Sequence, residues 1–235
     1  MRKKIIVLTL IILLLGSTLA LIANVNENNI SYAAYVRALP ESSGQVLVDP
    51  SLKVELFFKD GLKGPATSMA FLAPDDILVL EKNTGKVQRI VNGSLEQNPL
   101  LQVKVGTEVE LGMLGIAISK NQQGKTFVFL YYTEADSSGI VIANRLYRYE
   151  LIDNKLVNPL LLLNLPATSP ILGHENNHNG GKVLIGPDNN VYLVVGDVGG
   201  RMGNIQNIMR GSSPDGTSGI LRVTQDGKSV HNGPF

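Results

Sequence analysis

The sequence predicts an all-β protein built from repeated antiparallel units, and three observations carry this prediction. Beyond Ala23, short apolar runs rich in Val, Ile, Leu and Tyr alternate with turn signals made of Gly, Pro, Asn and Asp. No segment in that region keeps a 3.6-residue apolar period, so we expect helices to be minor at most. The runs also fall into three similar groups, which is typical of a β-propeller.

The N-terminus is predicted to be a targeting segment. Met1–Lys4 is basic, and Ile5–Ala23 is an uninterrupted apolar run that would form a helix about 28 Å long. A helix of this length can serve as an uncleaved membrane anchor; alternatively, a signal peptide is cleaved after Ala33, where Ser31 and Ala33 supply small residues. Either way we expect the chain from Asn24 onward to be exported, and either membrane-anchored or secreted.

Residues 24–60 are predicted to be a polar linker and lead-in, and residues 61–235 to be a partial propeller. Each group has an apolar strand that ends in a turn, then a second strand, then a third strand in which basic and apolar residues alternate. The expected strands are Ala70–Asp75, Ile77–Glu81 and Val87–Val91, then Ile116–Asn121, Phe127–Tyr132 and Leu146–Tyr149, then Val183–Asp188, Val191–Val195 and Ile220–Val223.

The spacing of the three groups is irregular, and we interpret Asn154–Gly180 as an insertion between the second and third groups. Closed propellers generally need about four to eight blades. Three groups therefore predict the N-terminal part of a longer protein. A small open β-sandwich made from the same strands is the alternative.

The composition excludes several classes of function. The formal charge is +1, and it falls to −2 once Arg2, Lys3 and Lys4 of the N-terminal segment are left out. This balance argues against a nucleic-acid partner. Cysteine is absent, so the chain has no disulfide, no thiolate zinc site and no lipidated cysteine.

The stretch Gly173–Asp197, GHENNHNGGKVLIGPDNNVYLVVGD, has two interpretations. His174-Glu175-x-x-His178 matches the zinc metallopeptidase motif, which requires a helix to place both imidazoles on one side of the metal. The residues around His178 are Asn and Gly, which are poor helix formers. The second interpretation is a His-Asn-Gly-Gly turn followed by a hairpin with a Pro-Asp-Asn-Asn turn. It places His178 at the start of an inner strand.

Three stretches together resemble one known family. They are ELGMLGIAI (Glu110–Ile118), HNGGKVLIGPDNNVYLVVGD (His178–Asp197) and SGILRVTQDG (Ser218–Gly227), with a weaker match at Leu78–Ile90. In this order and spacing they are similar to the glucose/sorbosone dehydrogenase family, which includes soluble PQQ glucose dehydrogenases and aldose sugar dehydrogenases. The resemblance implies a six-bladed β-propeller with pyrroloquinoline quinone (PQQ) and calcium on its axis, a sugar substrate and an external electron acceptor.

The resemblance also implies roles for individual residues. His178 matches the general base that takes the proton of the sugar C1 hydroxyl while hydride passes to the quinone. Glu110 and Asn177 match positions near the cofactor, where soluble glucose dehydrogenases have Gln and Asp. An ordinary solvated carboxylate and a turn former are the alternatives for these two residues. Asp197 is expected to cap a turn, and Arg201 to be a surface loop cation.

The family's basic cofactor clamp and its calcium loop lie downstream of the last matching stretch. We therefore expect the calcium ligands beyond residue 235 and no metal site within this chain, and we expect the chain to be inactive on its own. The leading hypothesis is an exported PQQ-dependent sugar dehydrogenase. The alternative is a non-catalytic extracellular propeller that binds a glycan or a protein on its loop face.

Overall fold

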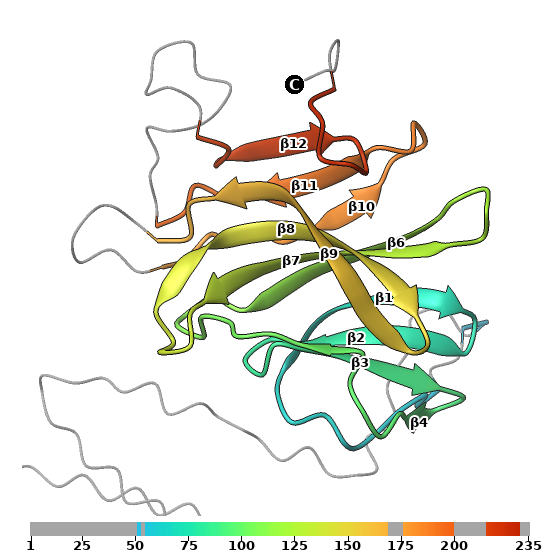
Figure 1. Cartoon of the computed structure of the whole chain (residues 1–235). Coiled ribbons are helices and arrows are strands. Elements are labelled where there is room, and N and C mark those ends of the chain that lie inside the picture. The colour runs from blue at the N-terminus through green and yellow to red at the C-terminus, as the bar shows by residue number, and fades with distance from the viewer. Residues whose placement is uncertain (1–50, 53–54, 169–175, 200–214, 231–235) are drawn as a thin grey trace, which may run out of the picture. The chain divides into compact units, whose positions relative to one another are not determined.

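The computed structural model describes residues 51–52, 55–168, 176–199 and 215–230, and in these ranges the fold is all-β, as predicted (Figure 1). None of the described residues forms a helix able to cross a membrane. The expected N-terminal helix, Ile5–Ala23, lies outside the described residues. The chain divides into residues 1–54 and 55–235, and all that follows concerns the second unit.

Three antiparallel sheets follow one another along the chain, each with its strands in sequence order. The first sheet contains β1 (Ala66–Ala73), β2 (Asp76–Glu81), β3 (Lys86–Val91) and β4 (Ser94–Leu95), with β5 (Leu101–Gln102) also paired to β3. The second contains β6 (Met113–Lys120), β7 (Thr126–Ala135), β8 (Val141–Ile152) and β9 (Lys155–Leu165). The third contains β10 (Val183–Ile185), β11 (Val191–Val195) and β12 (Gly219–Val223). All nine predicted strands are present.

The second sheet is covered on both faces, which explains why its central strand is apolar throughout. Along β7, Phe129 and Tyr131 point into a core shared with the third sheet. Val128, Leu130 and Tyr132 point the other way, into a core shared with the first sheet. Since side chains alternate between the faces of a strand, this burial on both sides requires a sheet packed between two others.

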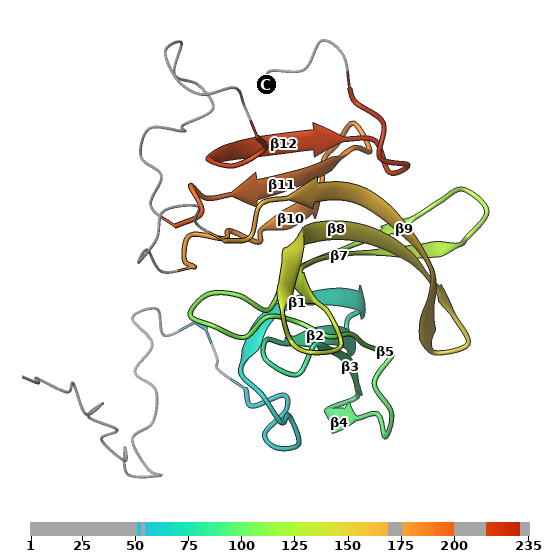
Figure 2. The same cartoon turned by 60° about the vertical axis from the view of Figure 1, so that its left-hand side comes forward.

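The first strands of the three sheets lie next to one another, with β1 against β6 and β6 against β10. Figure 2 shows the three sheets in succession, seen from another side. Repeated antiparallel sheets that pack face to face, each covering its neighbour, are the arrangement that the internal repeats predicted.

The interpretation of Asn154–Gly180 as an insertion is wrong for its first part, because Lys155–Leu165 is strand β9. The strand is irregular: Asn158 has a φ of +53°, and its pairing with β8 shifts register between Val157 and Leu160, across Pro159, and again between Leu161 and Leu163. Proline is tolerated at the edge of a sheet, where no partner needs its missing N–H group. Because Pro159 interrupts the apolar run, the sequence pattern did not indicate a strand here.

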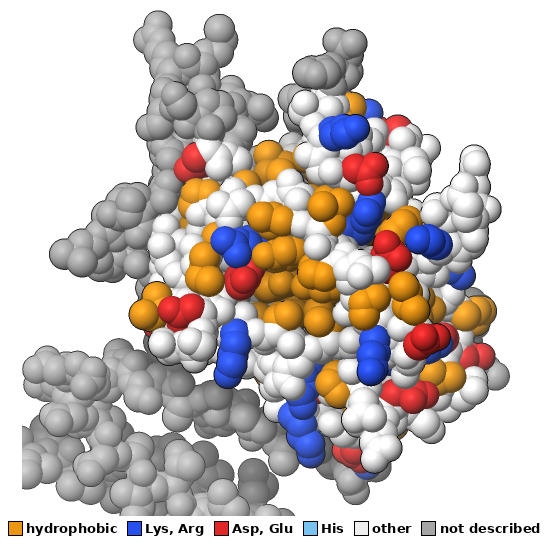
Figure 3. Space-filling model, in the orientation of Figure 1, with side chains coloured by type: hydrophobic (Ala, Val, Ile, Leu, Met, Phe, Trp, Pro, Cys, Tyr) orange, Lys and Arg blue, Asp and Glu red, His pale blue; other side chains and the backbone are white. Residues whose placement is uncertain are grey.

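The outer edge of the second sheet, at β9, carries exposed apolar side chains. Hydrophobic side chains gather over β8 and β9 in Figure 3, and Leu160 and Leu161 of β9 are 36% and 43% exposed. The proline and the register shifts in β9 interrupt its free edge, which limits pairing with another chain.

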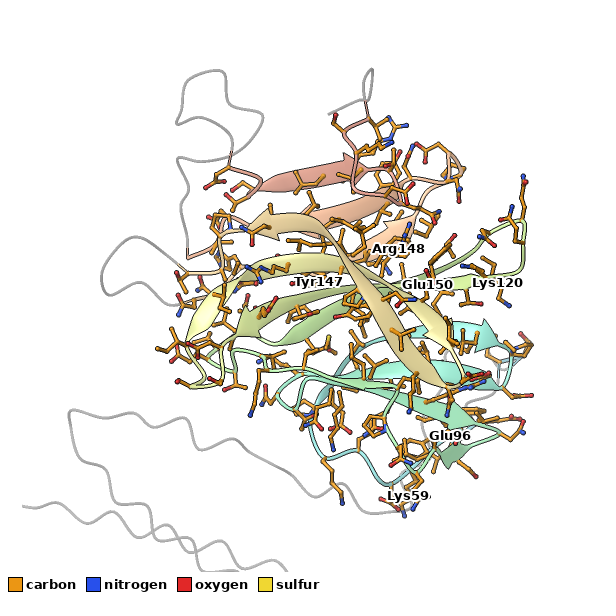
Figure 4. The ribbon with its side chains drawn as sticks, in the orientation of Figure 1. Lys59, Glu96, Lys120, Tyr147, Arg148 and Glu150 are labelled. Carbon is orange, nitrogen blue, oxygen red and sulfur yellow. The ribbon has the colours of Figure 1, made fainter. Side chains whose placement is uncertain are left out.

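Polar side chains join the second and third sheets around a cavity of about 560 Å³. Arg148, labelled on β8 in Figure 4, lies 4.6 Å from the centre of the Phe127 ring and donates to the Gln225 carbonyl oxygen at 3.0 Å. Lys125 and Glu150 form an ion pair at 3.5 Å. The hydrogen bond from Arg148 therefore links the second sheet to the turn after β12 of the third sheet.

Candidate functional site

His178 lies in a tight turn that leads into β10. Its φ is +58°, and the φ values of Gly180 and Gly181 are +74° and +130°. The turn is fixed to β11 and the segment after it, since Gly181 N donates to Val194 O at 3.0 Å and Gly199 N donates to Asn177 O at 2.9 Å. The two glycines thus provide the positive φ values that the turn interpretation predicted.

Two further glycines allow close backbone approach at this turn. A β-carbon on Gly115 of β6 would collide with the carbonyl oxygen of Gly181. A β-carbon on Gly196 would collide with the carbonyl oxygen of His178. The contact of Gly115 with Gly181 brings the stretches Glu110–Ile118 and His178–Asp197 together, and the contact of Gly196 with His178 closes the second stretch on itself.

The His178 ring is held by Asp197. Nδ1 of His178 lies 2.5 Å from Oδ1 of Asp197, and the two side chains are 53% and 19% exposed. In a neutral imidazole, a proton on Nδ1 donated to the carboxylate leaves Nε2 as a hydrogen-bond acceptor. The half-exposed ring therefore presents a proton-accepting nitrogen.

The Asp197 carboxylate contacts the His178 ring, so its expected role as a turn cap is not the one that the structure shows. A signal for this contact was present in the predicted hairpin, where Val183 pairs with Leu193 and Ile185 with Val191. Continuing that register backward from Val183 places residue 178 opposite residue 198, next to Asp197. Sequence reasoning missed the contact because it stopped at the ends of the strands.

Glu110 approaches the same turn from the loop before β6. The backbone N–H of His178 donates to Oε2 of Glu110 at 2.5 Å, and Asn176 Nδ2 donates to Oε2 of Glu108 at 3.2 Å. Between the two acids, Val109 has a φ of +46°. Lys82 Nζ donates to the Val109 carbonyl oxygen at 2.9 Å. The structure thus brings Glu110 and His178 together, although Glu110 binds the backbone of His178 and not its ring.

Asn177 precedes His178 but does not bind its ring. Its backbone oxygen accepts the hydrogen bond from Gly199, and its side-chain Oδ1 is buried without a hydrogen-bond partner among the described residues. Soluble glucose dehydrogenases have an acid at this position, whereas Asn177 carries no charge. His178 still has an anionic neighbour, because Asp197 lies beside its ring.

The zinc metallopeptidase interpretation lacks its helix. A φ of +58° at His178 is a left-handed conformation, which an α-helix cannot contain. His174 and Glu175 lie outside the described residues. The described part of the chain contains no group of three His, Asp or Glu side chains that could hold a metal ion. Arg201 also lies outside it.

The polar groups around His178 suit a sugar better than an anionic cofactor. Glu108, Glu110 and Asp197 contribute carboxylates, which accept hydrogen bonds from hydroxyl groups. PQQ carries carboxylates of its own and needs cationic partners. Lys82, the cation at the Glu110 loop, already donates to Val109 O and, at 3.3 Å, to Asn83 Oδ1. The described residues around His178 therefore offer carboxylate acceptors and a proton-accepting nitrogen, and Lys82 is bound to protein oxygens.

Solved structures of sugar dehydrogenases are similar to this chain. The PQQ-bound aldose sugar dehydrogenase of Streptomyces coelicolor is 27% identical, with a TM-score of 0.58 over 74% of this chain and 48% of its own. A putative oxidoreductase (glucose dehydrogenase) of Thermus thermophilus is 25% identical, with a TM-score of 0.57 over 73% of this chain and 48% of its own. The soluble aldose sugar dehydrogenase of Escherichia coli, in its apo-form, shares the fold at 18% identity, with a TM-score of 0.58 over 73% of this chain and 47% of its own.

The chain spans about half the length of these solved relatives, 48% in the first two cases. No curated protein sequence matches it. The family model for glucose/sorbosone dehydrogenase matches residues 62–235, which include the twelve strands of the described residues and the His178 turn. The chain therefore belongs to the glucose/sorbosone dehydrogenase family.

Proposed function

We propose that the protein acts as an exported, PQQ-dependent dehydrogenase that oxidises the C1 hydroxyl of an aldose sugar and passes the electrons to an external acceptor. The observation that carries the proposal is the pair of His178 and Asp197, in which the carboxylate holds Nδ1 and the ring is half exposed. Family membership and the PQQ-bound Streptomyces coelicolor relative support the choice of substrate class and cofactor.

In this proposal, Nε2 of neutral His178 removes the proton of the C1 hydroxyl. The bond between C1 and its hydrogen breaks, the hydrogen leaves C1 as hydride, and the C1–O bond becomes a carbonyl. PQQ, when bound, supplies the two-electron acceptor for that hydride. Asp197 stabilises the positive charge that develops on the imidazole, in the way that a buried acid supports a catalytic histidine.

Glu110 has a positioning role in this scheme. Its carboxylate accepts a hydrogen bond from the backbone N–H of His178 at 2.5 Å and so helps to fix the turn. A neutral Gln could accept the same hydrogen bond through its side-chain oxygen. The presence of Glu at this position is therefore compatible with the proposed reaction.

The N-terminal segment completes the proposal. Ile5–Ala23 would deliver the protein across the membrane and, if uncleaved, hold it there through the linker of residues 24–60. We also propose calcium as a second cofactor, with ligands downstream of residue 235 in the full-length protein.

The test replaces His178 with Ala in the full-length protein. We expect PQQ to bind as in the wild type and PQQ-dependent reduction of a dye by aldoses to disappear, because the proton acceptor is lost. Activity near that of the wild type would rule out His178 as the base. Absence of PQQ binding in the wild type would instead favour the non-catalytic binding propeller.

A further inference from the structure

Three buried polar side chains form a hydrogen-bonded network between the second sheet and the His178 turn. Thr133 of β7, Asn144 of β8 and Asn179 of the His178 turn are 0%, 0% and 1% exposed. Thr133 and Asn144 face each other as directly paired residues of β7 and β8. Their neighbours in the core are mostly apolar, so three polar side chains here need a specific explanation.

Each of these side chains is hydrogen-bonded to the next. Thr133 Oγ1 donates to Asn144 Oδ1 at 2.7 Å, and Asn144 Nδ2 donates to Asn179 Oδ1 at 2.7 Å and to Pro166 O at 3.1 Å. Asn179 Nδ2 donates in turn to Asn176 O at 3.0 Å. These hydrogen bonds therefore replace the hydrogen bonds to water that the polar groups lose on burial.

The two ends of this network reach the two loops of the candidate site. At one end, Gly112 N donates to Thr133 Oγ1 at 3.4 Å and Thr133 N donates to Gly112 O at 2.9 Å, two residues from Glu110. At the other end, Asn179 directly follows His178, and its backbone oxygen accepts a hydrogen bond from Tyr131 Oη at 3.0 Å. A continuous set of short contacts thus joins the Glu110 loop to the His178 turn.

We infer that this network, with Asn144 at its centre, is a positioning element that fixes the His178 turn relative to the Glu110 loop. Apolar packing is non-directional, whereas each hydrogen bond here has a defined partner and direction. Satisfied buried polar networks give a core one specific arrangement. The element acts on the reaction through His178 and touches no substrate itself. Its effect on catalysis rests on the proposed function; its effect on the His178 ring does not.

The test compares two substitutions at Thr133 in the full-length protein. Thr133→Val has nearly the same shape but removes Oγ1, which leaves Asn144 Oδ1 without its donor and Gly112 N without its side-chain acceptor. Thr133→Ser keeps the hydroxyl. A third variant, Asn144→Leu, removes the centre of the network. The control is Tyr149→Phe, which removes the hydrogen bond between the hydroxyls of Tyr132 and Tyr149, 3.0 Å apart in the core between the first and second sheets.

The first readout is the nitrogen NMR spectrum of the protein labelled at histidine. We expect Thr133→Val and Asn144→Leu to shift the His178 ring resonances and to weaken the signal of the Nδ1 proton held by Asp197. Thr133→Ser and Tyr149→Phe should give the wild-type spectrum. With PQQ and an aldose, kcat should fall about tenfold to a hundredfold in the first two variants, with KM changed by less than about twofold.

Lower melting temperatures without any change in the His178 resonances would overturn the inference and leave the network a purely structural role. The inference is also overturned if Tyr149→Phe shifts the His178 resonances as strongly as Thr133→Val does. If the wild type oxidises no sugar, the proposed function fails, while the NMR comparison still decides the positioning role.

Discussion

At the residue scale, two unusual backbone conformations meet at the candidate site. His178 and Val109 have φ values of +58° and +46°, in a region that costs an L-residue about 1–2 kcal/mol. Glu110, the residue after Val109, accepts the hydrogen bond from His178 N. Strained residues gather at functional sites, where surrounding contacts hold them in place. The strain here coincides with the contact between the two stretches that matched the family.

Asp197 can be tested by a change that keeps its shape. In Asp197→Asn, the side chain can still accept the Nδ1 proton of His178 but no longer carries the charge that stabilises the imidazolium. We expect kcat for PQQ-dependent sugar oxidation to fall by about 10²- to 10⁴-fold, the usual range for acid–base catalysis. Steady-state kinetics with a dye acceptor measure this. Activity within about twofold of the wild type would show that the charge has no part in the reaction.

Gly115 tests the close approach of the two stretches. In Gly115→Ala the new methyl group meets the Gly181 carbonyl oxygen, so the His178 turn must move. We expect a loss of about 1–3 kcal/mol in the free energy of unfolding and a loss of activity. Gly124→Ala is the control, because its β-carbon meets nothing within 4 Å while its φ of +78° makes Ala strained. That control should lose about 1–2 kcal/mol and keep full activity. Full activity in Gly115→Ala would contradict this account of the turn.

The turn at His178 could be predicted from the sequence because its residues are local signals, whereas the role of His178 as the base rests on the family resemblance. Asn and Gly on both sides exclude a helix, and the following hairpin fixes the start of β10. Asp197 could not be assigned in the same way, because its contact depends on how two segments meet beyond the paired strands. The same reason applies to the contact between Glu110 and the backbone of His178, which joins the loops before β6 and β10 of two different sheets.

At the element scale, β9 shows how a proline conceals a strand. Its residues were interpreted as an insertion, yet Leu162 is 7% exposed and lies in the core between the second and third sheets. The preceding residue, Leu161, is 43% exposed. The two neighbouring leucines therefore have opposite environments, as a strand requires.

The leucine pair gives a matched test of β9. Leu162→Ala should destabilise the protein by about 2–5 kcal/mol, because it leaves a cavity in the core. Leu161→Ala should change the free energy of unfolding by no more than about 0.5 kcal/mol, as is usual at the surface. Urea denaturation measures both. Equal effects of the two substitutions would mean that the segment is not a strand packed on this core.

Glu81 at the end of β2 gives the fold a dependence on pH. Its side chain is fully buried, which by itself would raise its pKa. Hydrogen bonds from Gln88 Nε2 at 2.8 Å and Thr84 Oγ1 at 2.7 Å outweigh burial and lower the pKa below the ordinary value of 4.5. A carboxyl with a lowered pKa in the folded state stabilises the protein above its unfolded pKa, and this contribution is lost as the pH falls through the folded pKa.

The test is Glu81→Gln at two pH values. At about pH 7 the variant should be less stable than the wild type, and at about pH 3 the difference should be smaller, because the wild-type carboxylate then approaches its protonated form. Urea denaturation at each pH gives the comparison. Glu55→Gln, at an exposed position, should match the wild type at both pH values. A difference that does not change with pH would contradict this role of Glu81.

At the scale of the whole molecule, the three sheets follow from sequence repetition, whereas the number of blades in a ring does not. The repeats predict the order of strands within each sheet, because each repeated unit is a series of hairpins between strands that are neighbours in sequence. How many units close a ring depends on the angle between neighbouring sheets, which no local pattern encodes. The expected six-bladed ring therefore rests on the family resemblance.

In such a ring each sheet lies between two others. The third sheet has a partly exposed apolar side, formed by Leu184, Val194 and Ile220. On the first sheet, Met69 and Phe71 of β1 are exposed in the same way. Further blades would cover these side chains, as the second sheet is covered on both faces.

The central claim is that this fold presents His178 to a sugar and to PQQ. Its most direct test is a titration of the full-length protein with PQQ in the presence of calcium, followed by the absorbance of the quinone. The account predicts saturable binding that is lost when calcium is chelated, and bleaching of the bound quinone when an aldose is added. Absence of saturable binding, or bound quinone that no aldose reduces, would contradict it.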